Sequence, residues 1–266
     1  MSSPYIAAPG ANFVLADRPT RVDLFGNKTA AKAAIRDNAK AISGLAHRLY
    51  GEADRKLLIV LQGMDTSGKD GTTSAIFHRT PPLNVKVASF KSPTKKELVH
   101  DYLWRVHNVV PGKGEITVFN RSHYEDVLVV KVKNYASPET IEQRYTQIND
   151  FERLLVESGT TVLKFMLHIS PEVQGERLRD RLINPDKRWK FNPGDLDDRA
   201  LWPDFMNAYE TMVQRTSTEH APWHVIPSDS RKTRGAIISG IVRETLEKMD
   251  PQYPDPGYRP ADFQID

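Results

Sequence analysis

The sequence predicts an α/β protein in which a five-stranded parallel sheet carries helices on both faces, a three-layer α/β/α fold. Two observations predict it. Short, continuous apolar runs recur along the chain, as in strands that are buried on both faces, and segments with helical periodicity separate these runs. The 266 residues suffice for one large domain of this kind with a substantial core.

Five apolar runs are the expected strands. They lie at 57–61, 85–90, 115–120, 160–169 and 223–227. Helical patterns are expected at 28–50, 70–79, 95–109, 138–158, 171–183, 196–216 and 231–249. Because strands and helices alternate, the connections between parallel strands should be right-handed crossovers.

The expected domain spans residues 28–250 and includes a helical lid at about 178–200. Residues 1–27 contain several prolines and no sustained periodicity, so we expect an extended N-terminal arm over the surface. Prolines also recur after Asp250 and favour an unpacked C-terminal tail, residues 251–266.

Composition excludes several classes of protein. The chain has no cysteine, which rules out disulfide scaffolds, thiolate zinc sites and thiol nucleophiles, and which fits the cytoplasm. No stretch approaches the roughly 18 apolar residues of a membrane span, and the first residues lack the pattern of a signal peptide. A net charge of +3 is too small to favour nucleic-acid or membrane binding. We therefore expect a cytoplasmic protein that binds neither.

A phosphate-binding loop is predicted directly after the first strand. Gly63, Gly68 and Lys69 match G-x-x-x-x-G-K, the start of the Walker A motif, between a buried strand and a helix. Glycines let the backbone curl so that N–H groups face phosphate oxygens, and the helix that follows adds the positive end of its dipole. The alternative is a glycine turn with a surface lysine. The predicted phosphate-contacting residues of this loop are Gly63, Met64, Thr66, Ser67, Gly68, Asp70 and Gly71.

Two carboxylates in this loop are unusual. Asp70 stands where the motif ordinarily has Ser or Thr, and we expect it to point away from phosphate or to meet a cation. Asp65 lies among the phosphate-facing amides, where a carboxylate is costly unless a metal or an arginine compensates it. We interpret Asp65 as a ligand of Mg²⁺, and a loop-capping aspartate is the alternative.

A second polar cluster follows the third predicted strand, at the sheet edge where α/β proteins bind ligands. Arg121 can bind a phosphate with two hydrogen bonds. Glu125 and Asp126 can complete a Mg²⁺ shell with phosphate oxygens and waters. A structural ion pair between Arg121 and Asp126 is the alternative. His123 is expected to pack rather than to react.

Basic residues gather in the predicted lid. Arg177 and Arg181 share one helix face, Asn184-Pro185 ends that helix, and Trp189 lies in a basic turn. We interpret this segment as a lid that closes over phosphates, in which an arginine stabilises charge on the transferred group. The alternative is a solvated helix face. The predicted phosphate-contacting residues here are Arg177, Arg181, Lys187 and Arg188, and Lys133 is a further candidate outside the lid.

These segments together resemble the polyphosphate kinase 2 family. The strings that carry the resemblance are GMDTSGKDG, KSPTKKELVHDYLWRVH, FNRSHYEDVLV, NPDKRWKF and EHAPWHVIP, in the family's order over about residues 55–230. Many members have Asp immediately before the arginine of the second cluster. Asn120 in that place, with Glu125-Asp126, resembles the class III subgroup, which accepts AMP and ADP.

The resemblance implies a phosphate-binding-loop kinase fold similar to thymidylate kinase, with a helical lid. It implies transfer of a terminal phosphoryl group from inorganic polyphosphate to ADP and AMP, reversibly and with Mg²⁺ or Mn²⁺, in a homodimer or homotetramer. The catalytic roles implied for this chain fall to Asp65, Lys69, Arg121, Asp126 and Arg181. An ATP-dependent nucleoside or nucleotide kinase of the same fold is the alternative, and a non-catalytic polyanion-binding protein is a third hypothesis.

Overall fold

A computed structural model describes residues 3–10 and 12–265; the first two residues of the predicted arm, Ala11 and the last residue of the tail lie outside it. A six-stranded sheet occupies the centre, in the order β1-β6-β5-β2-β4-β3. The strands are β1 (Ile6–Ala7), β2 (Lys56–Gln62), β3 (Lys86–Ser89), β4 (Ile116–Asn120), β5 (Thr160–His168) and β6 (Trp223–Pro227). Strands β2 to β6 are mutually parallel, as expected, while β1 pairs antiparallel with β6.

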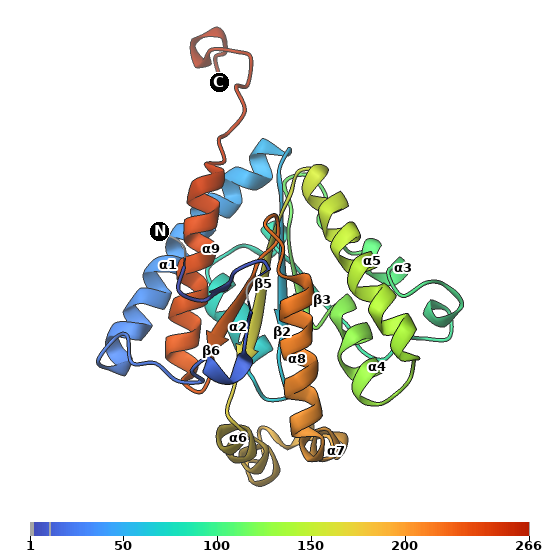
Figure 1. Ribbon diagram of the computed structural model, residues 1–266. Coiled ribbons are helices and arrows are strands. Elements are labelled where there is room, and N and C mark those ends of the chain that lie inside the picture. Colours follow the sequence, from blue (N-terminus) through green and yellow to red (C-terminus); the bar gives the residue numbers. More distant parts are fainter. Residues whose placement is uncertain (1–2, 11, 266) are drawn as a thin grey trace.

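Helices cover both faces of the sheet, which confirms the predicted three-layer fold (Figure 1). One face carries α1 (Lys28–Glu52), α2 (Lys69–Phe77) and α9 (Arg231–Met249), and the other carries α4 (Val129–Val132), α5 (Pro138–Glu157) and α8 (Trp202–Thr216). The helix α3 (Trp104–His107) lies beyond α5 in Figure 1. Short 3₁₀ turns are η1 (Leu15–Asp17), η2 (Pro82–Asn84), η3 (Glu97–Val99), η4 (His123–Val127), η5 (Arg188–Lys190) and η6 (Pro260–Asp262).

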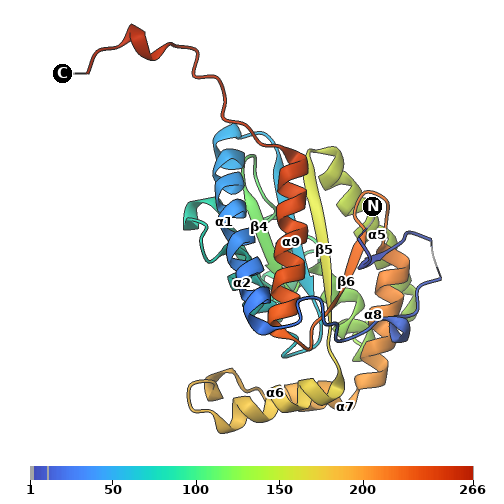
Figure 2. The ribbon, with the colours of Figure 1, turned by 90° about the vertical axis from the view of Figure 1, so that its left-hand side faces the viewer.

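The predicted lid is a helical unit beyond the carboxyl ends of the strands. It contains α6 (Pro171–Ile183), η5 and α7 (Gly194–Ala200), and Figure 2 shows α6 and α7 below the two helical layers. The tail after Asp250 extends from the opposite end of the molecule. Within the described ranges, no helix has the length and apolar character that crossing a membrane requires.

Three elements differ from the sequence prediction. The segment 95–109 forms only η3 and α3, because the backbone is extended at His100. The Asp101 carboxylate then accepts hydrogen bonds from the amides of Leu103 and Trp104 in the turn that leads into α3. The helix expected at 196–216 divides at Leu201, where Pro203 occupies the first turn of α8. The N-terminal arm is not a purely extended surface segment, since Ile6 and Ala7 join the sheet as β1 and Leu15–Asp17 forms the turn η1.

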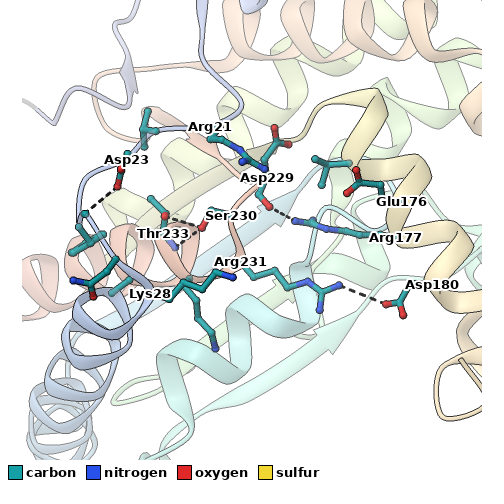
Figure 3. A pocket seen from close by; sticks show the side chains of 17 residues that line it. Arg21, Asp23, Lys28, Glu176, Arg177, Asp180, Asp229, Ser230, Arg231 and Thr233 are labelled. Atoms are coloured by element: carbon teal, nitrogen blue, oxygen red, sulfur yellow. Dashed lines mark hydrogen bonds and ion pairs between the residues drawn. The ribbon is translucent and has the colours of Figure 1, made fainter.

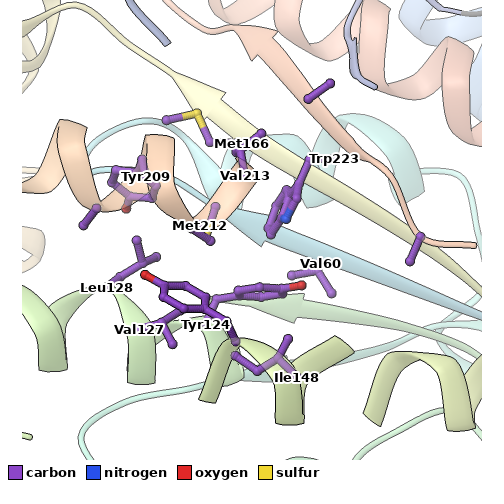
Figure 4. Close-up of a cluster of buried hydrophobic side chains, with 14 of the residues drawn as sticks. Val60, Tyr124, Val127, Leu128, Ile148, Met166, Tyr209, Met212, Val213 and Trp223 are labelled. Carbon is purple, nitrogen blue, oxygen red and sulfur yellow. The ribbon is translucent and has the colours of Figure 1, made fainter. Parts of the chain in front are cut away.

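Two apolar clusters fill the spaces between the layers. One lies between the sheet and α1, α2 and α9. The other, on the α5 and α8 side, includes Val60, Met166 and Met212 (Figure 4). Within it the rings of Tyr124 and Trp223 meet edge to face, with their centroids 4.8 Å apart. The arm contributes Phe13 and Leu15 to this second cluster, so part of the expected surface arm is core.

A buried ion pair lies in the second cluster. Lys164 Nζ on β5 bonds to Glu152 Oε2 on α5 at 2.6 Å, and both side chains are fully buried. The same ammonium donates to the Tyr124 hydroxyl at 2.9 Å and to the Thr216 carbonyl at 2.6 Å, while the Tyr124 hydroxyl donates to Glu152 Oε1 at 2.7 Å. Because Tyr124 lies in η4, this network fixes the segment that follows β4.

The buried pair predicts an asymmetry between single and double substitutions. Lys164→Met leaves the Glu152 carboxylate buried without its cation and should lower the free energy of unfolding by about 3–5 kcal/mol. The double variant Lys164→Met/Glu152→Leu should recover part of this loss, because no charge then remains buried. Urea unfolding measures both. A double variant less stable than the single variant would contradict this account.

Candidate active site

The candidate site lies where the order of the parallel strands reverses. Strand β2 runs between β4 and β5, which follow it in the sequence on opposite sides. In open α/β sheets the carboxyl ends of the strands border a ligand crevice at such a point. The residues between β2 and α2, 63–68, are called the glycine loop below, and they lie at this crevice.

Two positions in the glycine loop admit no side chain. Gly63 has φ +147°, and a Cβ there would lie 2.8 Å from the Leu167 carbonyl oxygen. Gly68 has φ +106°, and its Cβ would lie 2.3 Å from Arg234 Nη1. Thr66 also has a positive φ, of 64°. The loop therefore depends on backbone conformations that glycine adopts without strain.

Lys69 is the first residue of α2 and folds back over the glycine loop. Its Nζ donates to the Gly63 carbonyl at 2.7 Å and to the Met64 carbonyl at 3.3 Å. Burial lowers the pKa of this ammonium. The two hydrogen bonds hold this ammonium at the loop, beside the cavity where a phosphate would bind.

Two buried arginines, which also line the main cavity, bond to the glycine loop. Arg177 Nη1 on α6 donates to the carbonyls of Thr66 at 2.9 Å and Ser67 at 3.3 Å. Arg234 on α9 donates from Nη1 to the Ser67 carbonyl at 2.7 Å and from Nε to Thr72 Oγ1 at 3.0 Å. These bonds give the carbonyl oxygens of Thr66 and Ser67 positively charged partners.

Neither arginine forms an ion pair with a carboxylate of the described residues. Burial lowers the pKa of Arg234 to about 9, with Arg177 and Arg231 adding repulsion. The loop therefore carries two buried positive charges that a bound anion would neutralise.

Arg121 and Asp65 join the second polar cluster to the glycine loop. Arg121 directly follows β4 with φ +60°, and its Nη2 lies 2.6 Å from Asp65 Oδ1. Burial alone would raise the pKa of Asp65, but Lys69 and Arg121 together lower it. An arginine thus compensates the Asp65 carboxylate, and the alternative ion pair of Arg121 with Asp126 does not form.

Asp70 turns toward the neighbouring strand. Its Oδ1 accepts a hydrogen bond of 2.6 Å from the Asn120 amide, and its Oδ2 lies 3.7 Å from Lys190 Nζ in the lid. This arrangement explains the neutral residue at position 120, because an aspartate there would face the Asp70 carboxylate. Lys190 is the cation that we expected to lie near Asp70.

Glu125 and Asp126 are adjacent in sequence but face different spaces. Glu125 lines a small recess together with Gly63, Asp65 and Arg121, and burial raises its pKa. Asp126 instead pairs with Arg144 Nη1 at 3.2 Å and lines a separate cavity of about 400 Å³. The structure therefore brings Glu125, and not Asp126, to Asp65 and Lys69.

Ion pairs hold the basic side chains of the lid. Arg181 Nη1 lies 3.0 Å from Asp195 Oδ2, and Lys187 Nζ lies 2.7 Å from Asp180 Oδ2. Burial, with repulsion from Asp65, raises the pKa of Asp195 to about 6. These pairs leave the cations at the crevice, where phosphate oxygens would compete for them.

A cavity of about 680 Å³ unites the loop, the second cluster and the lid. Among its lining residues are these predicted ones: Asp65, Thr66, Gly68, Lys69, Asp70, Gly71, Arg121, Arg177, Arg181 and Lys187. Gly63 and Met64 line only the small recess. Ser67 is fully buried within the loop. Arg188 bonds to the Leu182 carbonyl, and Lys133 pairs with Asp198 at 2.5 Å, so neither lines this cavity.

Comparison with known protein families identifies the family to which a chain with this loop, polar cluster and lid belongs. The family model described as "Polyphosphate kinase 2 (PPK2)" matches residues 26–254. The chain belongs to the polyphosphate kinase 2 family.

Two relatives and one solved structure support the family assignment. An "AMP/ADP-polyphosphate phosphotransferase" of Meiothermus ruber is 52% identical over 231 residues, which are 87% of this chain and 86% of the relative. An "ADP-polyphosphate phosphotransferase" of Rhodopseudomonas palustris is 36% identical over 250 residues, 89% and 86% of the two chains. A crystal structure of polyphosphate kinase 2 from Arthrobacter aurescens TC1 superposes with a TM-score of 0.93 at 37% identity and covers 97% of this chain and 93% of its own.

The sequence prediction missed Arg231, Arg234 and Lys190, which also line the main cavity. A signal existed for the first two. Helix α9 begins with Arg231 and Lys232 and has no acidic residue in its first turn. Cations are unfavourable at the positive end of a helix dipole, so basic residues there indicate a nearby anion site.

The close approach of Gly68 to Arg234 predicts the effect of one methyl group. Gly68→Ala should displace the guanidinium and strain a positive φ, lowering the free energy of unfolding by about 1–3 kcal/mol. Gly71→Ala is the matched control, since its Cβ would have an ordinary 3.5 Å contact with Arg234 in a helical turn. Alanine should be neutral or stabilising there. Urea unfolding compares the two, and equal stabilities would contradict the packing described.

Proposed function

We propose that this protein transfers the terminal phosphoryl group of inorganic polyphosphate to ADP and AMP, and that the reaction is reversible. The single observation that carries the proposal is the cavity in which Lys69, Arg121 and the lid cations converge beside the glycine loop. Family membership supports polyphosphate as the donor. The name of the Meiothermus ruber relative supports both acceptors, as does the class III resemblance.

The proposed chemistry requires positioning and charge neutralisation rather than covalent catalysis. The end of the donor chain binds the amides of the glycine loop and Lys69. Arg121 contacts the transferred group or the acceptor phosphate from the other side. Arg181 and Lys187 exchange their carboxylate partners for phosphate oxygens when the lid closes.

We propose Mg²⁺, or Mn²⁺, as the cofactor, held by Asp65 and Glu125. Both carboxylates line the same recess at the glycine loop. The described residues contain no group of three or more histidine or acidic side chains placed to hold a metal. Mg²⁺ does not need one, since it is usually bound by one or two carboxylates together with substrate phosphates and waters. When bound, the ion would neutralise charge on the phosphates.

Asp126 receives a different proposed role. It lies in the neighbouring cavity with Tyr102, Arg105 and Arg144. Arg105 donates to the carbonyl of Lys91, which lines the main cavity, so the two spaces are adjacent. We propose that the acceptor nucleotide places its phosphates near Arg121 and extends its nucleoside toward Asp126.

A luciferase assay tests the activity. Purified protein is incubated with polyphosphate, ADP and Mg²⁺, and ATP formation is followed with AMP and GDP in parallel. ATP formed from ADP supports the proposal. Phosphorylation that requires ATP as the donor would instead identify an ATP-dependent kinase, and polyphosphate binding without turnover would identify a binding protein. The cytoplasmic location and the homodimer or homotetramer expected from the sequence stay predictions.

Lys69 gives the first kinetic prediction. Lys69→Met keeps the length of the side chain but removes the ammonium at the loop mouth, so kcat should fall by on the order of 10²–10³. The luciferase assay measures the change. Lys113→Met is the control, because this exposed lysine pairs with Asp54 at the other end of the sheet. A Lys69→Met variant with near-normal turnover would rule out the proposed role of Lys69.

Asp65 and Asp126 should respond differently to metal. Asp65→Asn removes a proposed ligand charge, so the Mg²⁺ concentration for half-maximal activity should rise by at least about tenfold. Asp126→Asn should leave this Mg²⁺ dependence unchanged and raise the KM for ADP. Mg²⁺ titrations at saturating ADP separate the two effects. The reverse result would restore Asp126 as the metal ligand.

A further inference from the structure

The central strand ends in a polar residue. Gln62 is the last residue of β2 and immediately precedes the glycine loop. Its side chain is fully buried, although it carries both a hydrogen-bond donor and an acceptor. A buried amide is costly unless both of its ends have partners. The partners of Gln62 therefore indicate why a glutamine stands at this position.

The Gln62 amide connects β2 with the segment that follows β4. Its partners assign the two ends of the amide. The nitrogen donates to Glu125 Oε1 at 3.0 Å, and the oxygen accepts from the Ser122 backbone N–H at 3.2 Å and from the Ser122 hydroxyl at 3.1 Å. Ser122 precedes η4, and its hydroxyl oxygen accepts from the Tyr124 amide at 3.2 Å. One buried amide thus holds both the start of η4 and the carboxylate of Glu125.

Gln62 provides the direct polar contact of the Glu125 carboxylate. Arg121 pairs with Asp65, and Lys69 donates to carbonyls of the glycine loop. In the part of the chain that the structure describes, no lysine or arginine lies within ion-pair distance of Glu125. A glutamate without a contact samples several rotamers, and fixing it in one of them costs entropy. The Gln62 amide holds Oε1, and Oε2 remains for the recess that Glu125 lines.

The two proposed metal ligands stand on different walls of this recess, and each wall is held by hydrogen bonds. Asp65 comes from the glycine loop and Glu125 from η4. On the loop wall, Arg177 bonds to the loop and also donates to the Asp229 carbonyl at 2.7 Å, which ties the loop to the segment before α9 (Figure 3). On the η4 wall, the Gln62 amide is the corresponding contact. Hydrogen bonds that orient a ligand side chain strengthen the binding of a metal.

We propose that Gln62 is a positioning residue, which aims the Glu125 carboxylate at the divalent cation. The inference rests on the proposed function, because it concerns a proposed ligand of Mg²⁺. Gln62 itself touches neither the cation nor the phosphates. It holds Oε1 of Glu125, and Glu125 binds the cation through Oε2. Because Gln62 also ends the strand that leads into the glycine loop, it fixes the spacing between Glu125 and Asp65.

The variant Gln62→Met tests this role, because methionine has a similar length but no amide N–H. The Mg²⁺ concentration for half-maximal activity should rise by about tenfold or more, as expected for the loss of a group that orients a metal ligand. At saturating Mg²⁺, kcat should stay within about threefold of the wild-type value, because the change affects binding of the ion rather than the chemical step. Calorimetry should show weaker Mn²⁺ binding to the protein with ADP, which tests the ligand geometry without turnover.

Asn84→Leu is the matched control. The Asn84 amide is also buried and donates to the Ala46 carbonyl at 3.2 Å, but it lies just before β3, at the amino ends of the parallel strands. This variant should lose stability and keep the wild-type Mg²⁺ dependence. Gln62→Glu separates the two contacts of Gln62. It keeps an acceptor for Ser122 but faces Glu125 with an oxygen instead of an N–H, so it should also weaken Mn²⁺ binding.

A double-mutant cycle with Glu125→Gln shows whether Gln62 acts through Glu125. In the Glu125→Gln background, Gln62→Met should weaken Mn²⁺ binding no further, because the effects of coupled residues are not additive. Additive effects, normal Mn²⁺ binding by Gln62→Glu, or a loss of kcat in Gln62→Met that saturating Mg²⁺ does not restore would each overturn the inference. A wild-type protein that binds Mn²⁺ and polyphosphate but forms no ATP from ADP would refute the proposed function separately.

Discussion

The hydrogen bonds from two buried arginines to the glycine loop are the interaction on which the rest of the site depends. Arg177 comes from α6 of the lid and Arg234 from α9 of the opposite layer, and both bond to the Ser67 carbonyl. These bonds fix the orientation of the Thr66 and Ser67 carbonyls. Buried charges without carboxylate partners are costly, and this cost is offset when a polyanion binds. The Ser67 carbonyl thus connects the glycine loop to α6 of the lid and to α9.

The cations of the lid form ion pairs with carboxylates that phosphate oxygens could replace. Asp195, Asp180 and Asp70 each contact a lid cation, at 3.0, 2.7 and 3.7 Å. A phosphate chain offers many equivalent oxygens, so each cation can change partner without leaving the protein surface. Pairs of this kind keep long side chains ordered before binding, which reduces the entropy lost when a ligand binds. Burial raises the pKa of Asp195 to about 6, so this carboxylate takes up a proton, and loses its pairing with Arg181, at a higher pH than an ordinary aspartate would.

Much of the fold follows from local patterns, whereas side-chain directions at the site do not. The strands β2, β4, β5 and β6 are buried apolar runs, so their positions were predictable. The loop motif pointed to Lys69 and the polar cluster after β4 pointed to Arg121, and both side chains line the main cavity. Glu125 and Asp126 could not be separated by sequence, because their 3₁₀ turn points adjacent residues in directions about 120° apart. Arg234 was missed because its contact with the loop spans 167 positions, a distance that no local pattern encodes.

Strand β1 covers the outer backbone edge of β6 with only two residues. An uncovered strand edge presents free N–H and C=O groups to which other chains can add, and proteins block it by coverage or by keeping the strand short. At the other border, β3 has four residues and an exposed Val87. The sheet thus resists growth by strand addition at both borders, through coverage at one and through shortness at the other.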